Sequence, residues 1–212
     1  VVGIPAILPS FVGATLQREI DVESPVIEHP KHPFVFILGG AKFETKLPLI
    51  EKFKHVDYVY IGGALLNDIL KAKGFEVGKS LVSSTEFNMS GVLSMGNIVI
   101  PEDVVVQTGQ DISIKKIDEV GAEDLIMDVG PSMTLKLEQV LKSAKFVLWN
   151  GPMGNYEKGY KDQTIGMAKA VISSTEEGSV YALLGGGDTT AALASLGVEE
   201  STNKNLFVST GG

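Results

Sequence analysis

The stretch Val180-Tyr-Ala-Leu-Leu-Gly-Gly-Gly-Asp-Thr-Thr-Ala-Ala-Leu-Ala194 is the most informative part of this chain. Its apolar start predicts a buried strand over residues 180–184, and residues 189–196 have the pattern of a helix. The glycines between them let the backbone approach a ligand closely. Because the first N–H groups and the positive dipole end of a helix attract anions, the stretch predicts a phosphate site at the C-terminal edge of a sheet.

Asp188 follows these glycines directly. Its carboxylate would lie where a divalent cation on a polyphosphate could bind. A second interpretation fits the same residues, in which the stretch is a tight strand-to-helix turn and Asp188 or Thr189 is an ordinary N-cap. The sequence of this stretch leaves both interpretations open.

Strands and helices alternate along the rest of the chain, which predicts a parallel sheet with helices on both faces. We expect an α/β fold, a Rossmann-like three-layer αβα sandwich with a mostly parallel sheet of about six strands. Ligands of such sheets bind outside the carboxyl ends of the strands. The predicted strands are 34–38, 58–61, 98–100, 104–106, 125–128, 146–149, 180–184 and 206–208. The predicted helices are 14–20, 45–54 with Pro48 in its first turn, 64–73, 134–143, 164–173 and 189–196, with connections at 24–33 and 111–122.

Composition excludes several classes of protein. A net charge of −8 argues against a nucleic-acid partner, and the absence of cysteine excludes a disulfide framework. No apolar run is long enough to span a membrane and no signal peptide is present, so we expect a soluble, cytoplasmic protein. Arg18 is the single arginine, so the chain cannot build the arginine cluster that favours bidentate binding of a small phosphorylated acid. The ends, Val1 and Ser-Thr-Gly-Gly212, suggest a piece of a longer polypeptide.

Two lysine-containing glycine segments need separate interpretations. In Gly39-Gly-Ala-Lys-Phe-Glu-Thr-Lys46, both lysines lie near a predicted helix N-terminus, where the dipole disfavours cations. An anion would normally occupy that space, although two solvated surface lysines would fit the sequence as well. Gly74-Phe-Glu-Val-Gly-Lys-Ser80 has one residue too few between its glycines for a phosphate-binding P-loop and follows a helix. We interpret Gly74 as a helix C′ residue.

The segment Trp149-Asn-Gly-Pro-Met-Gly-Asn-Tyr-Glu157 ends a predicted strand and begins a loop. Asn150 could bond a phosphate or a ribose, and Glu157 could accept hydrogen bonds from ribose hydroxyls. Asn-Gly-Pro is also ordinary turn chemistry, and that alternative stays open.

Taken together, the segments resemble the C-terminal, nucleotide-binding domain of phosphoglycerate kinase. The family implies two Rossmann-like domains joined by a hinge, of which the N-terminal one binds the phosphoglycerate and the C-terminal one binds MgADP or MgATP. The matching stretches occur in the family's order and are Phe34–Lys46, Tyr60–Gly63, Val77–Leu81, Pro101–Val106, Asp128–Pro131, Trp149–Gly154, Gly185–Thr189 and Ser209–Gly212. On this resemblance we expect one domain over residues 1–212, with 1–33 as a remnant of the interdomain helix and its connection, 34–212 as the α/β core, and the N-terminal domain absent.

The resemblance also implies roles for individual residues. Lys42 would contact the transferring phosphoryl group and Lys46 the nucleotide phosphates. Asp188 would hold or orient magnesium, Asn150 would contact the phosphate chain, and Glu157 would bind the ribose. The glycine-rich turn would hold phosphate oxygens through Gly185, Gly186, Gly187 and Thr189. The adenine slot would be lined by Gly40, Gly62, Gly63 and Leu81.

Some residues depart from the family pattern. Ala64 stands where a third glycine is common, and Asn155-Tyr156 precedes Glu157 in place of a small apolar residue and phenylalanine. The segment 83–97 is short, which suggests a trimmed helix.

Three functions remain to compare. The first is the MgADP- or MgATP-binding half of a phosphoglycerate kinase, able to bind nucleotide but inactive alone. The second is a non-catalytic nucleotide-binding module or a dissected folding unit. The third, a dinucleotide-dependent oxidoreductase, would need G-x-G-x-x-G after the first strand, and Gly39-Gly-Ala-Lys42 does not supply that spacing.

Overall fold

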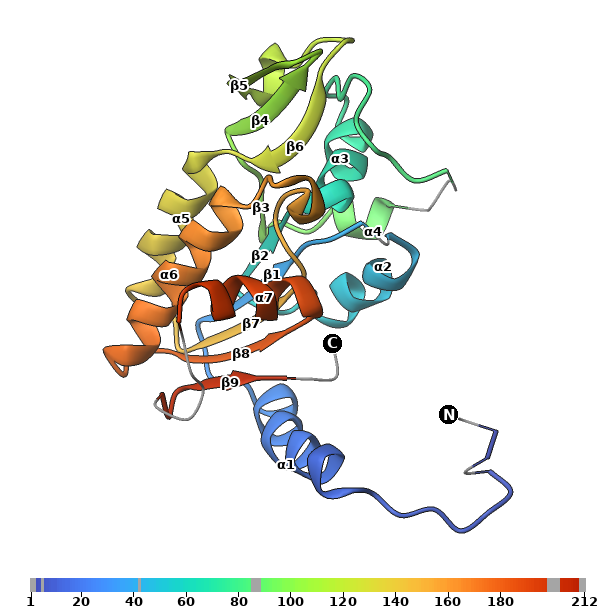
Figure 1. The fold of residues 1–212 in the computed structure, drawn as a ribbon, viewed down its shortest axis with the longest axis vertical. Helices are drawn as coiled ribbons and strands as arrows, with labels where there is room; N and C mark the ends of the chain where they lie inside the picture. Colours follow the sequence, from blue (N-terminus) through green and yellow to red (C-terminus); the bar gives the residue numbers. More distant parts are fainter. Residues whose placement is uncertain (1–2, 5, 42, 85–88, 198–202, 210–212) are drawn as a thin grey trace.

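A parallel sheet of six strands forms the centre of the molecule (Figure 1). The structure, a computed structural model, describes residues 3–4, 6–41, 43–84, 89–197 and 203–209. The strands run in the order β3-β2-β1-β7-β8-β9, and each pairs with its neighbours in parallel. Their bounds are β1 Phe34–Leu38, β2 Tyr58–Ile61, β3 Ile98–Val99, β7 Phe146–Asn150, β8 Tyr181–Gly185 and β9 Leu206–Val208.

Helices cover both faces of this sheet, which confirms the predicted three-layer α/β fold. From β1 the chain passes through α2 and α3 toward one edge, and from β7 it passes through α6 and α7 toward the other. Right-handed crossovers in opposite directions place these two pairs on opposite faces. The helices are α1 Ala14–Glu28, α2 Phe43–Lys52, α3 Gly63–Ala72, α4 Ser90–Leu93, α5 Pro131–Leu141, α6 Asp162–Glu176 and α7 Gly187–Ser195. The strand order reverses between β1 and β7, so the carboxyl ends of these two strands flank the switch point of the sheet, where open α/β sheets bind ligands.

The central strands are apolar because they are buried on both faces. All five residues of β1 are buried, and Phe34 packs against Phe146 of β7 with ring centroids 4.7 Å apart. Trp149 at the end of β7 is fully buried and donates its indole N–H to the carbonyl of Gly151 at 2.8 Å. This rigid centre fixes the positions of the turns that follow β1 and β7.

A second, antiparallel sheet of three strands lies beyond one end of the first (Figure 1). Its order is β5-β4-β6, formed by Asp111–Lys116, Asp103–Thr108 and Leu125–Val129. The expectation that residues 111–122 form only a connecting excursion is therefore wrong, because β5 pairs with β4 along its whole length. Ile112 and Ile114 are exposed on this edge strand, so no buried apolar pattern marked it in the sequence.

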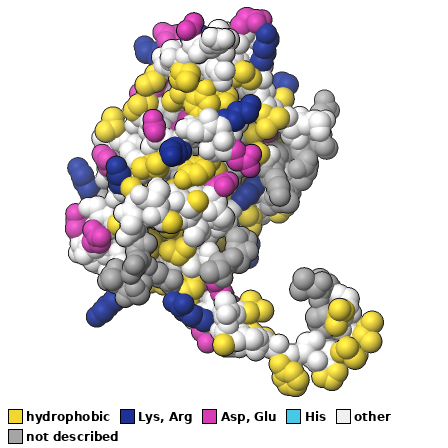
Figure 2. All heavy atoms as spheres, in the orientation of Figure 1, with side chains coloured by type: hydrophobic (Ala, Val, Ile, Leu, Met, Phe, Trp, Pro, Cys, Tyr) yellow, Lys and Arg dark blue, Asp and Glu magenta, His cyan; other side chains and the backbone are white. Residues whose placement is uncertain are grey.

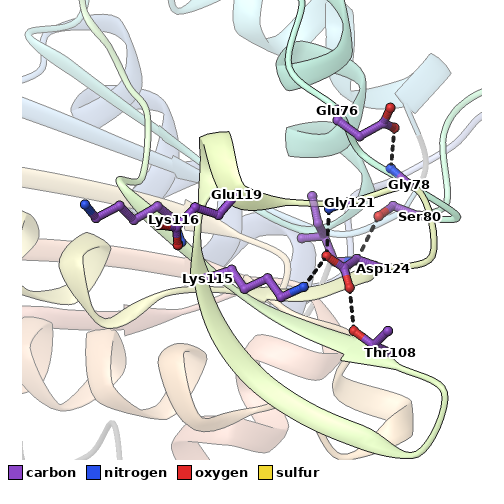
Figure 3. Close-up of polar contacts among 10 residues, drawn as sticks. Glu76, Gly78, Ser80, Thr108, Lys115, Lys116, Glu119, Gly121 and Asp124 are labelled. Atoms are coloured by element: carbon purple, nitrogen blue, oxygen red, sulfur yellow. Dashed lines mark hydrogen bonds and ion pairs between the residues drawn. The ribbon is translucent and has the colours of Figure 1, made fainter.

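Asp124 ties this hairpin together just before β6 (Figure 3). Its carboxylate accepts a hydrogen bond from the backbone N–H of Gly121 at 2.8 Å and another from the hydroxyl of Thr108. It also forms an ion pair with Nζ of Lys115 at 2.7 Å. The hydrogen bond from Gly121, followed by those from Lys115 and Thr108, lowers the pKa of Asp124 to about 2. The carboxylate is therefore charged and fully paired at neutral pH.

Several helix ends differ from the sequence-based expectations. Helix α1 continues through Pro25 to Glu28, so the predicted connection over residues 24–33 is wrong in its first half. Val22 and Val26 pack against the core and hold the helix together past the proline. Helix α2 begins at Phe43, which places Pro48 inside the helix rather than in its first turn.

Other boundaries follow the expectations. Gly74 is the C′ residue of α3, as predicted: its N–H bonds the carbonyl of Lys71, and the N–H of Phe75 bonds that of Leu70, both at 3.0 Å. The segment that was expected to hold a trimmed helix contains the four-residue α4. In the described part of the chain, no helix is both long and apolar enough to cross a membrane.

Candidate functional site

Three glycine turns interlock at the carboxyl ends of β1, β2 and β7. Gly39 and Gly40 donate their N–H groups to the carbonyls of Asn150 and Pro152, each at 2.9 Å, and Gly63 donates to Met153 at 2.6 Å. A Cβ atom on Gly39 would lie 2.0 Å from the carbonyl oxygen of Pro152. Glycine is required there because two backbones are in direct contact.

A cavity of about 280 Å³ opens beside these turns. One wall comes from the β1 and β2 turns and from α3, and the opposite wall from β6 and the loop after β7. Its lining includes Gly40, Ala41, Gly63, Ala64, Leu66, Asn67, Leu81, Ile126, Met127, Asp128, Val129, Pro152, Met153, Gly154, Asn155, Tyr156, Glu157 and Asp188. The cavity thus joins segments from both sheets and from the N-terminus of α7.

Five of the predicted site residues border this cavity, namely Gly40, Gly63, Leu81, Glu157 and Asp188. They come from five segments that are separated in the sequence. Gly62 does not border the cavity: it is buried against Met153, whose Cα atom a Cβ on Gly62 would approach to 2.8 Å. The small residue there lets the β2 turn pack on the loop after β7.

A second group of predicted residues lies next to the cavity, where β7 and β8 end. Lys46 of α2 donates a hydrogen bond from Nζ to Oδ1 of Asn150. The amide nitrogen of Asn150 lies near the next turn, since a Cβ on either Gly185 or Gly186 would be 3.6 Å from it. The structure therefore brings Lys46, Asn150 and the glycine turn of β8 together at one edge.

Helix α7 points its N-terminus into this edge. Its N-cap is Gly186, which has no side chain with which to cap the helix. The alternative in which Asp188 or Thr189 is the N-cap is therefore wrong. Thr189 is buried, and its hydroxyl accepts the N–H of Gly151 at 3.0 Å, which leaves the hydroxyl proton to donate elsewhere. The first N–H groups of the helix, from Gly187 onward, have no partner inside the helix because of the geometry of helix starts.

The lysine expected to contact the transferring phosphoryl group, Lys42, lies outside the described residues. Asp188 is exposed and borders the cavity at the start of α7. Across the described ranges, no three His, Cys, Asp or Glu side chains cluster so that they could hold a metal ion by themselves. One carboxylate beside a phosphate site nevertheless fits Mg²⁺, which is bound in nucleotide sites by one or two carboxylates together with substrate phosphates.

Asp128, at the end of β6, is a cavity residue to which sequence reasoning gave no role. It is only 4% exposed, and its carboxylate accepts the N–H of Val129 at 2.9 Å and that of Gln163 at 3.4 Å. Burial, opposed by these hydrogen bonds and aided by nearby Asp162, raises the pKa of Asp128 to about 7. The signal available in the sequence was its place directly after an apolar run, at the carboxyl end of a strand.

The loop that carries Glu157 packs directly on this carboxyl group. A Cβ on Gly154 would lie 2.4 Å from Cγ of Asp128, and the N–H of Asn155 bonds the carbonyl of Met127 at 2.7 Å. The hydroxyl of Tyr160 donates to Gln107 of β4 at 2.9 Å. The second sheet therefore supports the loop that forms one wall of the cavity.

The chain matches known proteins in both sequence and fold. The family model described as phosphoglycerate kinase matches residues 1–212. A phosphoglycerate kinase of Zymomonas mobilis is 35% identical over 222 residues, which is 99% of this chain and 55% of the relative. The structure of phosphoglycerate kinase from Coxiella burnetii superimposes with a TM-score of 0.79 at 32% identity, covering 94% of this chain and 53% of that one. That from Pyrococcus horikoshii gives 0.76 at 25% identity, covering 100% and 55%.

The chain thus spans about half the length of the relatives that it matches. The match covers the glycine turns, the cavity and the α7 N-terminus described above, all within residues 1–212. The chain belongs to the phosphoglycerate kinase family.

Proposed function

We propose that this chain is the nucleotide-binding half of a phosphoglycerate kinase and that it binds MgADP or MgATP at the cavity beside the switch point. The observation that carries the proposal is a single cavity bordered by flat glycine turns, by the carboxylate of Glu157 and by the N-terminus of α7 at Asp188. A base, a ribose and a phosphate chain need these three kinds of surface.

The base would lie against the backbone of Gly40, Gly63 and Ala64, with Leu81 on the open side. Leu81 is 63% exposed, and an exposed leucine beside a cavity gains burial when an apolar ring covers it. Ala64 adds one methyl group to this wall relative to the family's common glycine. Glu157 is exposed on the adjacent loop, where its carboxylate could accept hydrogen bonds from ribose hydroxyls.

The phosphates would lie at the N-terminus of α7, where unpaired N–H groups and the helix dipole favour anions. Lys46 would add positive charge, and its bond to Asn150 fixes the direction of the ammonium group. Asp188 would bind Mg²⁺ from the protein side, and the ion would neutralise phosphate charge. Phosphoryl transfer needs positioning and charge neutralisation from the protein, so these groups can serve catalysis without a covalent intermediate.

The remaining half of the family's fold would bind the phosphoglycerate, and this chain alone would bind nucleotide without transferring phosphate. Its single arginine agrees with that division, since planar binding of a carboxylate and a phosphate favours arginine. Large apolar side chains are exposed on the N-terminal segment, including Ile7 at 83% and Phe11 at 94%. Figure 2 shows hydrophobic side chains along an arm that extends away from the body of the molecule. We propose that they pack on that other half.

Calorimetric titration with MgADP tests the proposal on the wild type, Lys46→Ala and Asp188→Asn. We expect saturable binding by the wild type and a loss of about tenfold or more in each variant, the value of one charge-assisted hydrogen bond. Matched controls remove the same charges elsewhere. Lys145→Ala changes an exposed lysine just before β7, at the amino ends of the strands and so away from the proposed site. Asp111→Asn changes an exposed aspartate at the start of β5.

Both controls should bind MgADP as the wild type does. Absence of binding by folded wild-type protein, or equal losses in the controls, would contradict the proposal. Adding the other half of a phosphoglycerate kinase should then restore phosphoryl transfer, which separates a kinase half from a non-catalytic module.

A further inference from the structure

Strand β5 forms an open edge of the second sheet. The order β5-β4-β6 gives it one neighbour, β4, and in the described part of the chain no strand pairs with its outer side (Figure 1). Ile112 and Ile114 are 62% and 57% exposed on this strand, and no proline interrupts residues 111–116. An exposed strand edge that carries apolar side chains is a template for pairing with another strand.

The pairing of β5 with β4 determines which backbone groups of β5 face this edge. The N–H of Ile117 donates to the carbonyl of Glu102 at 3.1 Å, in continuation of the β4–β5 register. Bonded and non-bonded positions alternate along an antiparallel pair. The odd-numbered residues of β5 therefore bond β4, and its even-numbered residues turn their N–H and C=O groups outward. The same period of two places all even-numbered side chains on one face of the sheet.

Two of the three even-numbered residues remain available to another strand. The N–H of Lys116 already donates to the side chain of Glu119 at 3.3 Å. Ile112 and Ile114 therefore present the outward backbone groups that a new strand could bond. Their side chains share one face, on which Ile114 lies opposite the half-buried Val105 of β4. The edge thus offers hydrogen-bonding groups and an apolar stripe over the same three-residue span.

The sequence of this edge is complementary to itself in one antiparallel register. With Ser113 opposite Ser113 of a second copy, Ile112 lies opposite Ile114 and can exchange two backbone hydrogen bonds with it. Both isoleucine pairs then fall on the same face. On the other face, Asp111 lies opposite Lys115 of the second copy, and opposite charges in this position attract. A register shifted by two residues in either direction loses this charge pair.

We propose that two copies of this chain associate by pairing their β5 strands in this register, which joins the two three-stranded sheets into one of six strands. A two-fold axis at Ser113 relates the copies, and such an axis closes the assembly at two chains. The contact is small, so we expect a dissociation constant of about 10 µM to 1 mM. The residues that line the cavity of the candidate site do not include β5, so this pairing is independent of the proposed nucleotide binding.

Sedimentation equilibrium tests the association between about 10 µM and 1 mM protein. We expect a concentration-dependent dimer for the wild type. Ile114→Lys should raise its dissociation constant by about tenfold or more, because it places a charge within the isoleucine cluster. Leu135→Lys is the matched control, since it adds the same charge at a leucine of α5 that is 58% exposed, and it should leave the constant unchanged.

Disulfide cross-linking tests the register, because the chain contains no cysteine. In the proposed dimer the two copies of Ser113 form a non-hydrogen-bonded pair with Cα atoms about 4.5 Å apart, within the reach of a disulfide. Ser113→Cys should therefore give a covalent dimer under mild oxidation. Gln110→Cys, exposed in the turn before β5, is the control. Its two copies would lie about 20 Å apart and should stay mostly unlinked.

Three results would overturn this inference. The first is a wild type that stays monomeric over the whole concentration range. The second is association that Ile114→Lys leaves unchanged, or that Phe11→Lys abolishes instead, since the contact would then lie on the N-terminal segment. The third is faster cross-linking by Gln110→Cys than by Ser113→Cys, which would exclude the register. Circular dichroism with thermal unfolding checks that each variant is folded.

Discussion

Asp128 should make the stability of this protein fall as the pH rises through the range from 5 to 7. Its carboxyl group has an ordinary pKa of 3.8, and burial raises the pKa of Asp128 to about 7 in the folded protein. Between these values the folded protein keeps the proton while the unfolded chain releases it. The folded state then binds more protons, so its free energy of unfolding declines with increasing pH and levels off above about 7.

The magnitude follows from the two pKa values. At about 1.4 kcal/mol for each pH unit, the full change is about 4 kcal/mol, of which about 3 kcal/mol falls between pH 5 and pH 8. Asp128→Asn removes the titration but keeps the shape of the side chain. The difference in unfolding free energy, wild type minus variant, should therefore decrease by about 3 kcal/mol between pH 5 and pH 8.

Urea unfolding of both proteins at pH 5, 6, 7 and 8 measures this difference, and subtraction cancels the titration of groups shared by both. The absolute value at any one pH includes the cost of turning an amide N–H₂ group toward the N–H of Val129 or Gln163, so the slope is the informative quantity. A difference that is constant over this range, or one that grows with pH, would refute the reasoning. It would mean that hydrogen bonding outweighs burial at this carboxyl group.

Three further changes test the packing of the site and its support. Gly39→Ala should destabilise the protein by about 2 kcal/mol or more, because the new methyl group meets the Pro152 carbonyl, whereas Gly96→Ala, in open space, should stay within about 0.5 kcal/mol in urea unfolding. Thr189→Val should cost about 1–3 kcal/mol in the same assay, since it leaves a buried N–H without an acceptor, and an unchanged stability would contradict that bond. Asp124→Asn should cost about 2 kcal/mol at pH 7. Because the pKa of Asp124 is lowered to about 2, this deficit should narrow as the pH falls below 3.8, and a deficit independent of pH would argue against the ion pair.

Much of the fold could be predicted from the sequence because the main strands are buried on both faces. Phe34–Leu38 and Phe146–Asn150 are nearly continuous apolar runs that end in glycine turns, and such runs between helical segments predict a parallel sheet. The strand Asp111–Lys116 could not be predicted in the same way. Its residues are mostly exposed, and it exists because it pairs with the neighbouring strand β4.

The location of the candidate site could be predicted to a similar extent. Glu157 lies on the loop after β7 and Asp188 at the start of α7, just after β8, and the topology of a parallel sheet brings the carboxyl ends of strands together. Asn67, a single polar residue inside a helix, gave no such signal, and Asp128 gave only its place at the end of a short apolar run. Their burial at the wall of a cavity comes from the packing of α3 and of the second sheet, which the local sequence does not determine.

The central claim is that nucleotide binds at the carboxyl ends of β1, β2, β7 and β8. Backbone amide chemical shifts, recorded by NMR during titration of the wild type with MgADP, test its location directly. The account predicts saturable shifts concentrated at residues 63–67, 151–157 and 187–189, with little change at the amino ends of the strands near Phe34 and Tyr181. Shifts concentrated at those amino ends, or no shifts in a folded protein at saturating nucleotide, would contradict it.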